Sequence, residues 1–214
     1  SESYKEFLSD YYMAWGNYRL KGYENFYKTL VGGNPFFEYQ KKKYSDVKKD
    51  LKSILLVSDG HLTRQDLQEL ASYLSSNLQN YKIYYKLRPE EYDNFELLYK
   101  EILNENKNLN IINSDDPGLY YFLKKSNYVI GTNSTVLIEA LPLSNVIIYE
   151  KGWFFEMEDY VNNELMFSFK TKENILDFIL NGNADDINPN VEIFAENSIS
   201  SMNQITKNII SKRK

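Results

Sequence analysis

Short apolar runs alternate with helical patterns along this 214-residue chain from Ser53 onward. The run at 54–57 is continuous, which is typical of a strand buried on both faces. Segment 63–78 follows it, and its apolar residues recur at the spacing of one helix face, at Leu67, Leu70, Ala71 and Leu74. Strands that alternate with helices over short connections form a parallel sheet covered by helices on both faces. We therefore predict a Rossmann-like α/β fold.

The same alternation predicts the remaining elements. Further strands are expected at 82–87, 109–112, 128–130, 145–149 and 165–169. Further helices are expected from Pro89 to about Leu103, from about Ser134 onward, and over 119–125, 172–180 and 198–210. In the helix that Pro89 opens, the side chains expected to point inward are Phe95, Leu98, Tyr99 and Ile102.

The first fifty residues break this rhythm. Two short apolar runs end in glycines at Gly16 and Gly32, and a charged stretch follows over 39–52. We interpret 1–50 as an N-terminal α/β extension and interdomain linker, and 51–214 as the Rossmann-like domain. The extension is typical of the end of a preceding domain, which would need about a hundred or more further residues. We therefore expect the chain to be a fragment.

The amino-acid composition excludes several kinds of catalytic and binding site. The formal charge is −5, with a single histidine and no cysteine. The chain therefore has no disulfides, thiolate catalysis or cysteine-ligated metal, and a general role in nucleic-acid binding is not expected. We interpret His61 as a surface residue at a helix start. The basic clusters 41–43, 48–49, 124–125 and 212–214 are typical of solvated faces. The 19 tyrosines and 12 phenylalanines fit either codon bias or a carbohydrate-binding surface, and composition leaves both open.

Segment 128–141 carries the clearest functional pattern. An apolar run stops at Gly131, a small polar turn follows, and a helical pattern begins at once. That order directs free backbone N–H groups and the positive end of a helix dipole at one point, where phosphates bind. The residues expected to bind the phosphate here are Thr132, Asn133, Ser134 and Thr135. The alternative is an ordinary strand-to-helix turn capped by Ser134.

The turns at 58–61, 88–90, 113–118 and 131–135 all follow predicted strands. The carboxyl ends of parallel strands lie at one edge of the sheet, and ligands of such sheets bind outside that edge. Gly60 would allow a ligand to approach the backbone closely. The sequence therefore predicts that these turns converge on one crevice.

Five segments together resemble the carboxyl-terminal half of a GT-B glycosyltransferase. They are 14–16, 31–35, 54–60, 85–90 and 130–140, and the resemblance covers most of 11–180. The members it resembles are bacterial surface-polysaccharide enzymes: capsule and lipooligosaccharide transferases, GT-B sialyltransferases and relatives of the non-hydrolysing UDP-GlcNAc 2-epimerase. The motifs are short, so they are more specific for the fold than for the sugar.

The resemblance implies that this half binds the nucleotide of a sugar donor. Lys86, Leu87, Arg88 and Pro89 stand where the family has a Lys-Leu-His-Pro motif that faces the donor phosphate. Arginine remains a good phosphate ligand, whereas a proton-transfer role of the histidine would be lost. Ser134 and Thr135 match a hydroxyl pair that binds the phosphate in sialyltransferase-like members.

The resemblance implies roles for further positions. Glu139 matches a glutamate that binds the ribose hydroxyls in epimerase-like members, although a carboxylate near a helix start is also stabilised by the dipole alone. Asn113 and Ser114 would border the nucleobase, and an Asx-rich turn is the structural alternative. The aromatic residues 153–155 would face the donor sugar, another domain or the core.

The expected function is that of a glycosyltransferase in bacterial capsule or lipooligosaccharide synthesis, inactive as this isolated domain. Its donor would be CMP- or UDP-linked, with no cofactor and no metal, and its partners would be a glycan acceptor and a missing N-terminal domain that supplies the general base. No catalytic residue is assigned in this chain. The alternatives are an epimerase-like isomerase, a CDP-glycerol-type polyol-phosphate transferase and a non-catalytic nucleotide-binding module. The expected location is the cytoplasm, with the basic tail 212–214 as a weak signal for the inner face of the membrane.

Overall fold

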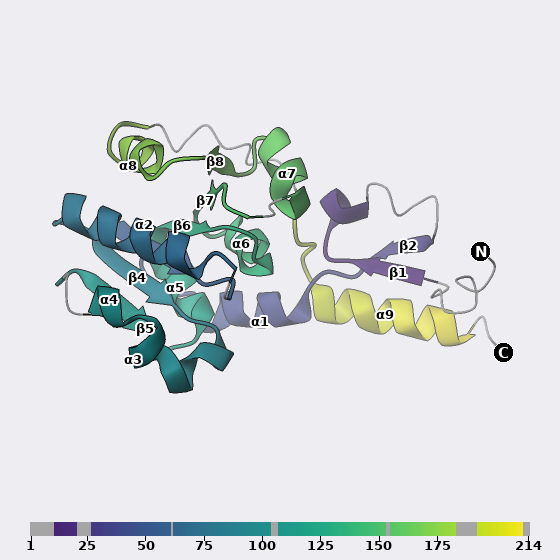
Figure 1. Cartoon of the computed structure of the whole chain (residues 1–214). Coiled ribbons are helices and arrows are strands. Elements are labelled where there is room, and N and C mark those ends of the chain that lie inside the picture. Colours follow the sequence, from purple (N-terminus) through teal and green to yellow (C-terminus); the bar gives the residue numbers. More distant parts are fainter. Residues whose placement is uncertain are drawn as a thin grey trace, which may run out of the picture. The chain divides into compact units, whose positions relative to one another are not determined.

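The computed structural model of the chain describes residues 11–20, 27–60, 62–103, 107–152, 155–182 and 192–211. The chain divides into two compact units. The larger unit spans Asp46–Asn188, and the smaller one combines Ser1–Ser45 with Pro189–Lys214. Figure 1 labels the helices and strands of both units.

The larger unit is built on a six-stranded sheet. Its strands are β3 (Asp50–Val57), β4 (Lys82–Lys86), β5 (Leu109–Ile112), β6 (Ser126–Gly131), β7 (Asn145–Tyr149) and β8 (Phe167–Phe169). They lie in the order β5-β4-β3-β6-β7-β8, and every neighbouring pair is parallel. The predicted Rossmann-like parallel sheet is confirmed.

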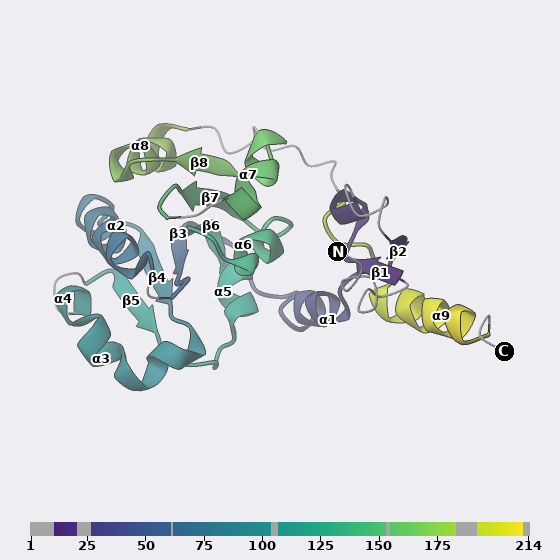
Figure 2. The same ribbon diagram turned by 45° about the vertical axis from the view of Figure 1, so that its right-hand side comes forward.

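Helices cover both faces of this sheet. Helices α2 (Arg64–Asn77) and α8 (Lys172–Asn181) contact each other on one face. On the opposite face, α5 (Leu119–Lys125) contacts β3 and β6, and α6 (Thr135–Ala140) contacts β6 and β7. The two views in Figures 1 and 2 show the sheet between these two layers. Helix α7 (Phe155–Asn162) connects β7 to β8.

The central strands carry the core. Ile54 and Leu56 of β3 are completely buried and pack in one cluster with Leu70 and Leu74 of α2. Leu55 lies between them in sequence and is equally buried. Successive side chains of a strand point to opposite faces, so β3 fills both helix–sheet layers. This explains why its sequence is a continuous apolar run.

The segment between β4 and β5 differs from the single helix expected between Pro89 and Leu103. It forms a 3-10 helix η3 (Pro89–Asn94) and two short helices, α3 (Phe95–Leu98) and α4 (Lys100–Leu103). The tighter winding of η3 accompanies the burial of Glu91, whose carboxylate accepts the backbone N–H of Arg88. The expected inward side chains are confirmed: Tyr99 and Ile102 are buried, and Phe95 and Leu98 pack against the core.

The smaller unit contains the elements at both ends of the described chain. Strands β1 (Tyr11–Ala14) and β2 (Lys28–Val31) form a parallel pair, and η2 (Asn17–Leu20) lies between them in sequence. Helices α1 (Pro35–Lys43) and α9 (Ser198–Ser211) contact each other.

The C-terminal residues, placed in the Rossmann-like domain by the sequence analysis, therefore group with the N-terminal ones. The backbone N–H of Ser198 donates to the carboxylate of Glu38 at 2.6 Å. Gly33 allows this approach, because a Cβ there would lie 2.3 Å from Ser198 Oγ. The ring of Phe194 also stacks on that of Phe37, with centroids 4.2 Å apart. Within the described ranges, no helix has both the length and the apolar character that a membrane span requires.

Candidate functional site

The strand order defines a switch point at the carboxyl edge of the sheet. From β3 the chain continues to β4 on one side, and from β6 it continues to β7 on the other side. The connections after β3 and β6 thus leave neighbouring strands in opposite directions. Ligands of doubly wound sheets bind in the crevice outside such a point. The predicted site residues lie at or just after the carboxyl ends of β3, β4, β5 and β6, with Lys86 as the last residue of β4, and only Glu139 lies further on, within α6.

The loops after β3 and β4 are in direct contact. Nη1 of Arg88 donates to the backbone carbonyl oxygen of Asp59 at 3.0 Å. Gly60 has a φ of +99°, and a Cβ there would lie 3.1 Å from the same Nη1 atom. A residue other than glycine would be strained in this conformation and would crowd the guanidinium. The structure therefore brings Gly60 and Arg88 together, as predicted.

The guanidinium of Arg88 retains hydrogen-bonding capacity. Its Nε lies 2.9 Å from a carboxylate oxygen of Glu90, and about half of the side chain is exposed. The contacts with Glu90 and with the Asp59 carbonyl use two of the five N–H bonds that a guanidinium carries. The remaining N–H groups can bind a second acceptor, such as a pair of phosphate oxygens.

The hydroxyl of Thr132, a predicted phosphate ligand, is already engaged. It donates to the carboxylate of Asp59, and the hydroxyl of Thr63 donates to the other oxygen of the same carboxylate. The two threonine oxygens lie 3.0 Å apart, and both residues are buried. Each hydroxyl has one proton, so neither can also donate to a phosphate while both hold Asp59.

Sequence reasoning gave Asp59 no role and missed Thr63. The contact between Asp59 and Thr132 joins residues 73 positions apart. It depends on the parallel pairing of β3 with β6, which no local pattern reveals. Thr63 carried a weaker signal, because it lies immediately before the first residue of α2, where threonine is a common cap.

The turn after β6 has a different geometry from the one expected. Ser134 caps α6 by accepting the backbone N–H of Val136 at 3.4 Å, as predicted for a strand-to-helix turn. Helix α6 contains only six residues, so its dipole contributes less to anion binding than the sequence pattern suggested. Thr135 is exposed at its first position. Oδ1 of Asn133 is buried and accepts no hydrogen bond from the described residues. Such an acceptor is costly to leave unpaired.

Lys86 is directed towards the loop after β5. Its ammonium group contacts the hydroxyl of Tyr92 and lies 3.3 Å from a carboxylate oxygen of Asp115. Burial lowers the pKa of Lys86, and the hydrogen bond and charge of Asp115 offset only part of this effect. Lys86, unlike Arg88, therefore belongs to the side of the edge where Asn113 and Ser114 lie. Ser114 itself donates to the carbonyl of Asp116 at 3.2 Å, as in an Asx-rich turn.

Pro89 begins η3 and is followed by a buried carboxylate that the sequence analysis did not single out. Glu91 is 2% exposed and accepts the backbone N–H of Arg88 at 3.0 Å. It also accepts Nε of Arg64 at 3.2 Å and the hydroxyl of Tyr99 at 2.7 Å. Burial alone would raise the pKa of Glu91, but the hydrogen bonds, led by the one from Arg88, outweigh burial and lower it. Glu91 thereby fixes the backbone of Arg88.

Glu139 lies on α6 and is half-buried. The hydroxyl of Tyr120, from α5, donates to its carboxylate. Burial raises the pKa of Glu139, and the hydrogen bond from Tyr120 offsets only part of this increase. A carboxylate has about four acceptor positions, so this single hydrogen bond leaves room for the hydroxyls of a ligand.

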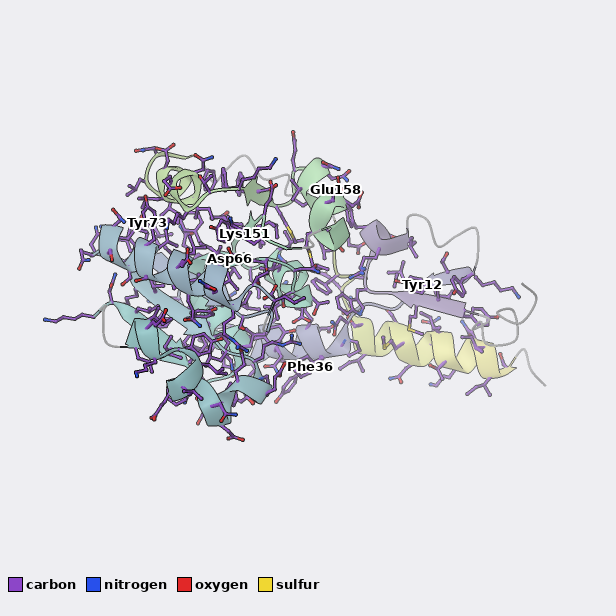
Figure 3. All side chains as sticks on the ribbon, in the orientation of Figure 1. Tyr12, Phe36, Asp66, Tyr73, Lys151 and Glu158 are labelled. Carbon is purple, nitrogen blue, oxygen red and sulfur yellow. The ribbon has the colours of Figure 1, made fainter. Side chains whose placement is uncertain are left out.

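The loop after β7 reaches the beginning of α2. Lys151 Nζ lies 4.0 Å from a carboxylate oxygen of Asp66, and Figure 3 labels both side chains. Gly152 follows, where a Cβ would lie 3.1 Å from a methyl carbon of Thr63. The loops after β3, β6 and β7 thus meet around Thr63. His61, Trp153 and Phe154 lie outside the described residues, as do the basic residues 212–214, and nothing is described of the Phe155 side chain.

No protein-family model and no curated protein sequence matches the chain. Among solved structures, UDP-GlcNAc 2-epimerase from Neisseria meningitidis, bound to UDP-GlcNAc, matches 93% of this chain with 16% identity and a TM-score of 0.61. MnaA of S. aureus with UDP matches 94% with 16% identity and a TM-score of 0.64. The wall teichoic acid polymerase TagF matches 96% with 13% identity and a TM-score of 0.54.

The chain spans about three-fifths of each of these proteins, namely 61%, 61% and 59% of their lengths. At such identities the likeness establishes the fold alone. The resemblance to one half of a GT-B fold is therefore confirmed at the level of the fold, and it is shared by epimerases and by a polymerase.

Proposed function

We propose that this chain binds a nucleotide sugar at the carboxyl edge of its six-stranded sheet, as the donor-binding half of a glycosyltransferase. One observation carries the proposal. The Arg88 guanidinium contacts the β3 loop beside the switch point, with N–H groups still able to bind an anion. A Cβ on Gly60 would lie 3.1 Å from Nη1 of Arg88, so the glycine keeps the guanidinium free of a crowding side chain.

In this proposal Arg88 binds the phosphate of the donor. Its remaining N–H bonds would meet two phosphate oxygens in the planar, bidentate geometry that guanidinium groups favour. Ser134 uses its oxygen as an acceptor for Val136, which leaves its hydroxyl proton for a third phosphate oxygen. As the sugar is transferred, negative charge develops on the departing phosphate, and Arg88 would stabilise it electrostatically. The proposed step uses no metal or cofactor.

The rest of the donor would lie along the same edge. The Glu139 carboxylate would accept the ribose hydroxyls, and the backbone of Asn113 and Ser114 would border the base. The buried, unpaired Oδ1 of Asn133 would accept a hydroxyl of the donor. Such a hydrogen bond would remove the cost of leaving the atom unpaired.

The remaining parts of the activity belong to partners outside this unit. The acceptor glycan and the base that deprotonates its hydroxyl would be supplied with a second domain, and closure of the two would complete the site. The expected context is bacterial surface-polysaccharide synthesis in the cytoplasm. Two of the similar structures are described with UDP-GlcNAc or UDP bound, which supports a UDP-linked donor as the first ligand to test ahead of CMP-linked ones.

Calorimetric titration with UDP-GlcNAc, UDP, CMP and GDP tests the proposal. We expect selective binding of one base, and a loss of about tenfold or more in affinity for Arg88→Ala, as for removal of a charged hydrogen bond. Lys82→Ala is the matched control, because Lys82 is an exposed cation at the opposite end of the same strand, β4. Equal loss in both variants, or no binding by the unmodified chain, would contradict the proposal.

A further inference from the structure

The carboxylate of Asp59 has an unusual set of partners for a group at an anion-binding edge. Four cations lie in the surrounding loops and helices, and each has its own carboxylate within 4.0 Å: Arg64 with Glu91, Lys86 with Asp115, Arg88 with Glu90, and Lys151 with Asp66. Asp59 forms none of these ion pairs. Its two oxygens are held by the neutral hydroxyls of Thr63 and Thr132. Among the residues that the structure describes, no cation therefore forms an ion pair with the Asp59 carboxylate.

This charge lies directly beside the proposed phosphate site. The Arg88 guanidinium binds the backbone carbonyl of Asp59 itself at 3.0 Å. Thr132 follows β6, the strand adjacent to β3, and its hydroxyl donates to the Asp59 carboxylate. A phosphate bound by Arg88 is therefore a close neighbour of an uncompensated carboxylate. Their repulsion grows with the number of charges on that phosphate.

We propose that Asp59 is a specificity-determining residue that favours the intact nucleotide sugar over the free nucleotide. This inference rests on the proposed function. In a nucleotide sugar, the phosphate next to the sugar is linked on both sides and carries a single negative charge. In the free nucleotide that phosphate is terminal and carries between one and a half and two charges at neutral pH. Asp59 repels the terminal phosphate more strongly.

The same difference promotes release of the product. During transfer, the bond between the sugar carbon and the phosphate oxygen breaks, and its electron pair stays on the oxygen. The sugar carbon bonds to the acceptor oxygen, and the acceptor proton goes to the base of the partner domain. The phosphate thereby gains one negative charge beside Asp59, whose repulsion opposes the stronger attraction that Arg88 exerts on the product. The residue distinguishes substrate from product by charge alone.

The test compares the affinities for UDP-GlcNAc and UDP in the unmodified chain and in Asp59→Asn. Asparagine keeps the shape and an acceptor oxygen for one threonine while removing the charge. We expect UDP to gain about tenfold in affinity relative to UDP-GlcNAc, the size of effect that a nearby charge has at a partly exposed site. Asp66→Asn is the control, because Asp66 is a partly exposed carboxylate that already pairs with Lys151. Asp66→Asn should leave the ratio of the two affinities unchanged.

A second measurement repeats the comparison at lower pH. Acidification through about pH 6 protonates the terminal phosphate of UDP but not the sugar-linked phosphate of UDP-GlcNAc. The gain in relative affinity for UDP that Asp59→Asn brings should therefore shrink as the pH falls through that value. If both ligands bind and Asp59→Asn leaves the ratio of their affinities unchanged, the inference is wrong and the proposed function stands. If neither ligand binds to any of the proteins, the proposed function fails and this inference fails with it.

Discussion

The hydroxyl of Tyr99 donates a 2.7 Å hydrogen bond to the carboxylate of Glu91 in the interior of the larger unit. The two residues are 0% and 2% exposed, so this is a buried charge held by specific donors. Arg64 and the backbone N–H of Arg88 complete its set of partners. The carboxylate thus connects α2, the residue that follows α3 and the loop that carries Arg88, and it orients the proposed phosphate ligand from within the core.

Replacing this carboxylate should destabilise the fold. In Glu91→Gln, an amide N–H would face donors that now bind a carboxylate oxygen. Because unpaired buried groups cost about 1–3 kcal/mol, we expect the free energy of unfolding to fall by that amount. The fold lowers the pKa of Glu91 below its ordinary 4.5. The ionised carboxylate therefore stabilises the folded state above that pH, and this stabilisation is lost as the pH falls. Urea unfolding at about pH 7 and about pH 4 would measure both effects.

Glu90→Gln is the matched control for that experiment. Glu90 precedes Glu91 in the chain and also contacts Arg88, but its side chain is 61% exposed. Exposed ion pairs contribute little, so we expect a change of less than about 0.5 kcal/mol in the free energy of unfolding. Similar losses in the free energy of unfolding for Glu90→Gln and Glu91→Gln would contradict the stabilising role of the buried Glu91 carboxylate.

Lys49 lies at the opposite edge of the sheet and should make stability depend on alkaline pH. Its ammonium group donates to the backbone carbonyls of Ser126 and Leu143. Burial, followed by the charge of Lys124, lowers its pKa from 10.5 to about 8. The unfolded chain therefore binds this proton more tightly than the folded one, and stability should rise with pH between those two values.

Lys49→Met should abolish that rise. The measurement is the free energy of unfolding in urea from about pH 7.5 to about pH 9.5, below the range where ordinary tyrosines ionise. Lys48→Met is the control, because Lys48 is the adjacent lysine and its replacement removes the same charge. A rise that persists in Lys49→Met, or that disappears in Lys48→Met, would rule out this role.

Gly131 should be intolerant of a side chain, because β6 ends there against β3 and α6. A Cβ would lie 2.8 Å from a methyl carbon of Val57 and 3.1 Å from one of Leu137. We expect Gly131→Ala to lower the free energy of unfolding by about 1–3 kcal/mol through overpacking. Adding Val57→Ala makes room, so the double variant should lose less than the sum of the single losses. Strictly additive losses would contradict this packing.

Tyr120 should hold down the pKa of Glu139. Burial raises this pKa above the ordinary 4.5, and the Tyr120 hydroxyl opposes burial. The folded protein therefore binds this proton more tightly than the unfolded chain, and Glu139 lowers stability as the pH rises through that range. Tyr120→Phe should raise the pKa of Glu139 further, as measured by a carbon-13 NMR titration of its carboxyl group. An unchanged or lower pKa would show that the Tyr120 hydrogen bond does not hold down the pKa of Glu139.

The strands were predictable because their signals are local. The bounds of β5 and β7 coincide with the apolar runs at 109–112 and 145–149, each bordered by polar or turn residues. A parallel strand buried on both faces, such as β7, requires such a run, whereas β5 is a less buried strand at the edge of the sheet. The convergence of the turns at one edge then follows from the parallel order, and it placed Gly60 and Arg88 correctly beside each other.

The details of the site were not predictable, because they depend on contacts distant in sequence. Thr132 looked like a free phosphate ligand, yet its hydroxyl is held by Asp59 through the pairing of β3 with β6. Glu91 carried no signal of its own in the sequence, since charged side chains are rarely buried. Lys86 appeared equivalent to Arg88 in the motif, but it turns to Asp115.

The most direct test of the account is to map ligand binding on the chain by amide NMR shifts during titration with UDP-GlcNAc. The account predicts that the largest shifts occur in the loops after β3, β4 and β6, including Gly60, Arg88 and Asn133, at the carboxyl edge of the sheet. Shifts confined to the opposite edge, around Lys49 and Ser144, or an unchanged spectrum at saturating ligand, would contradict it.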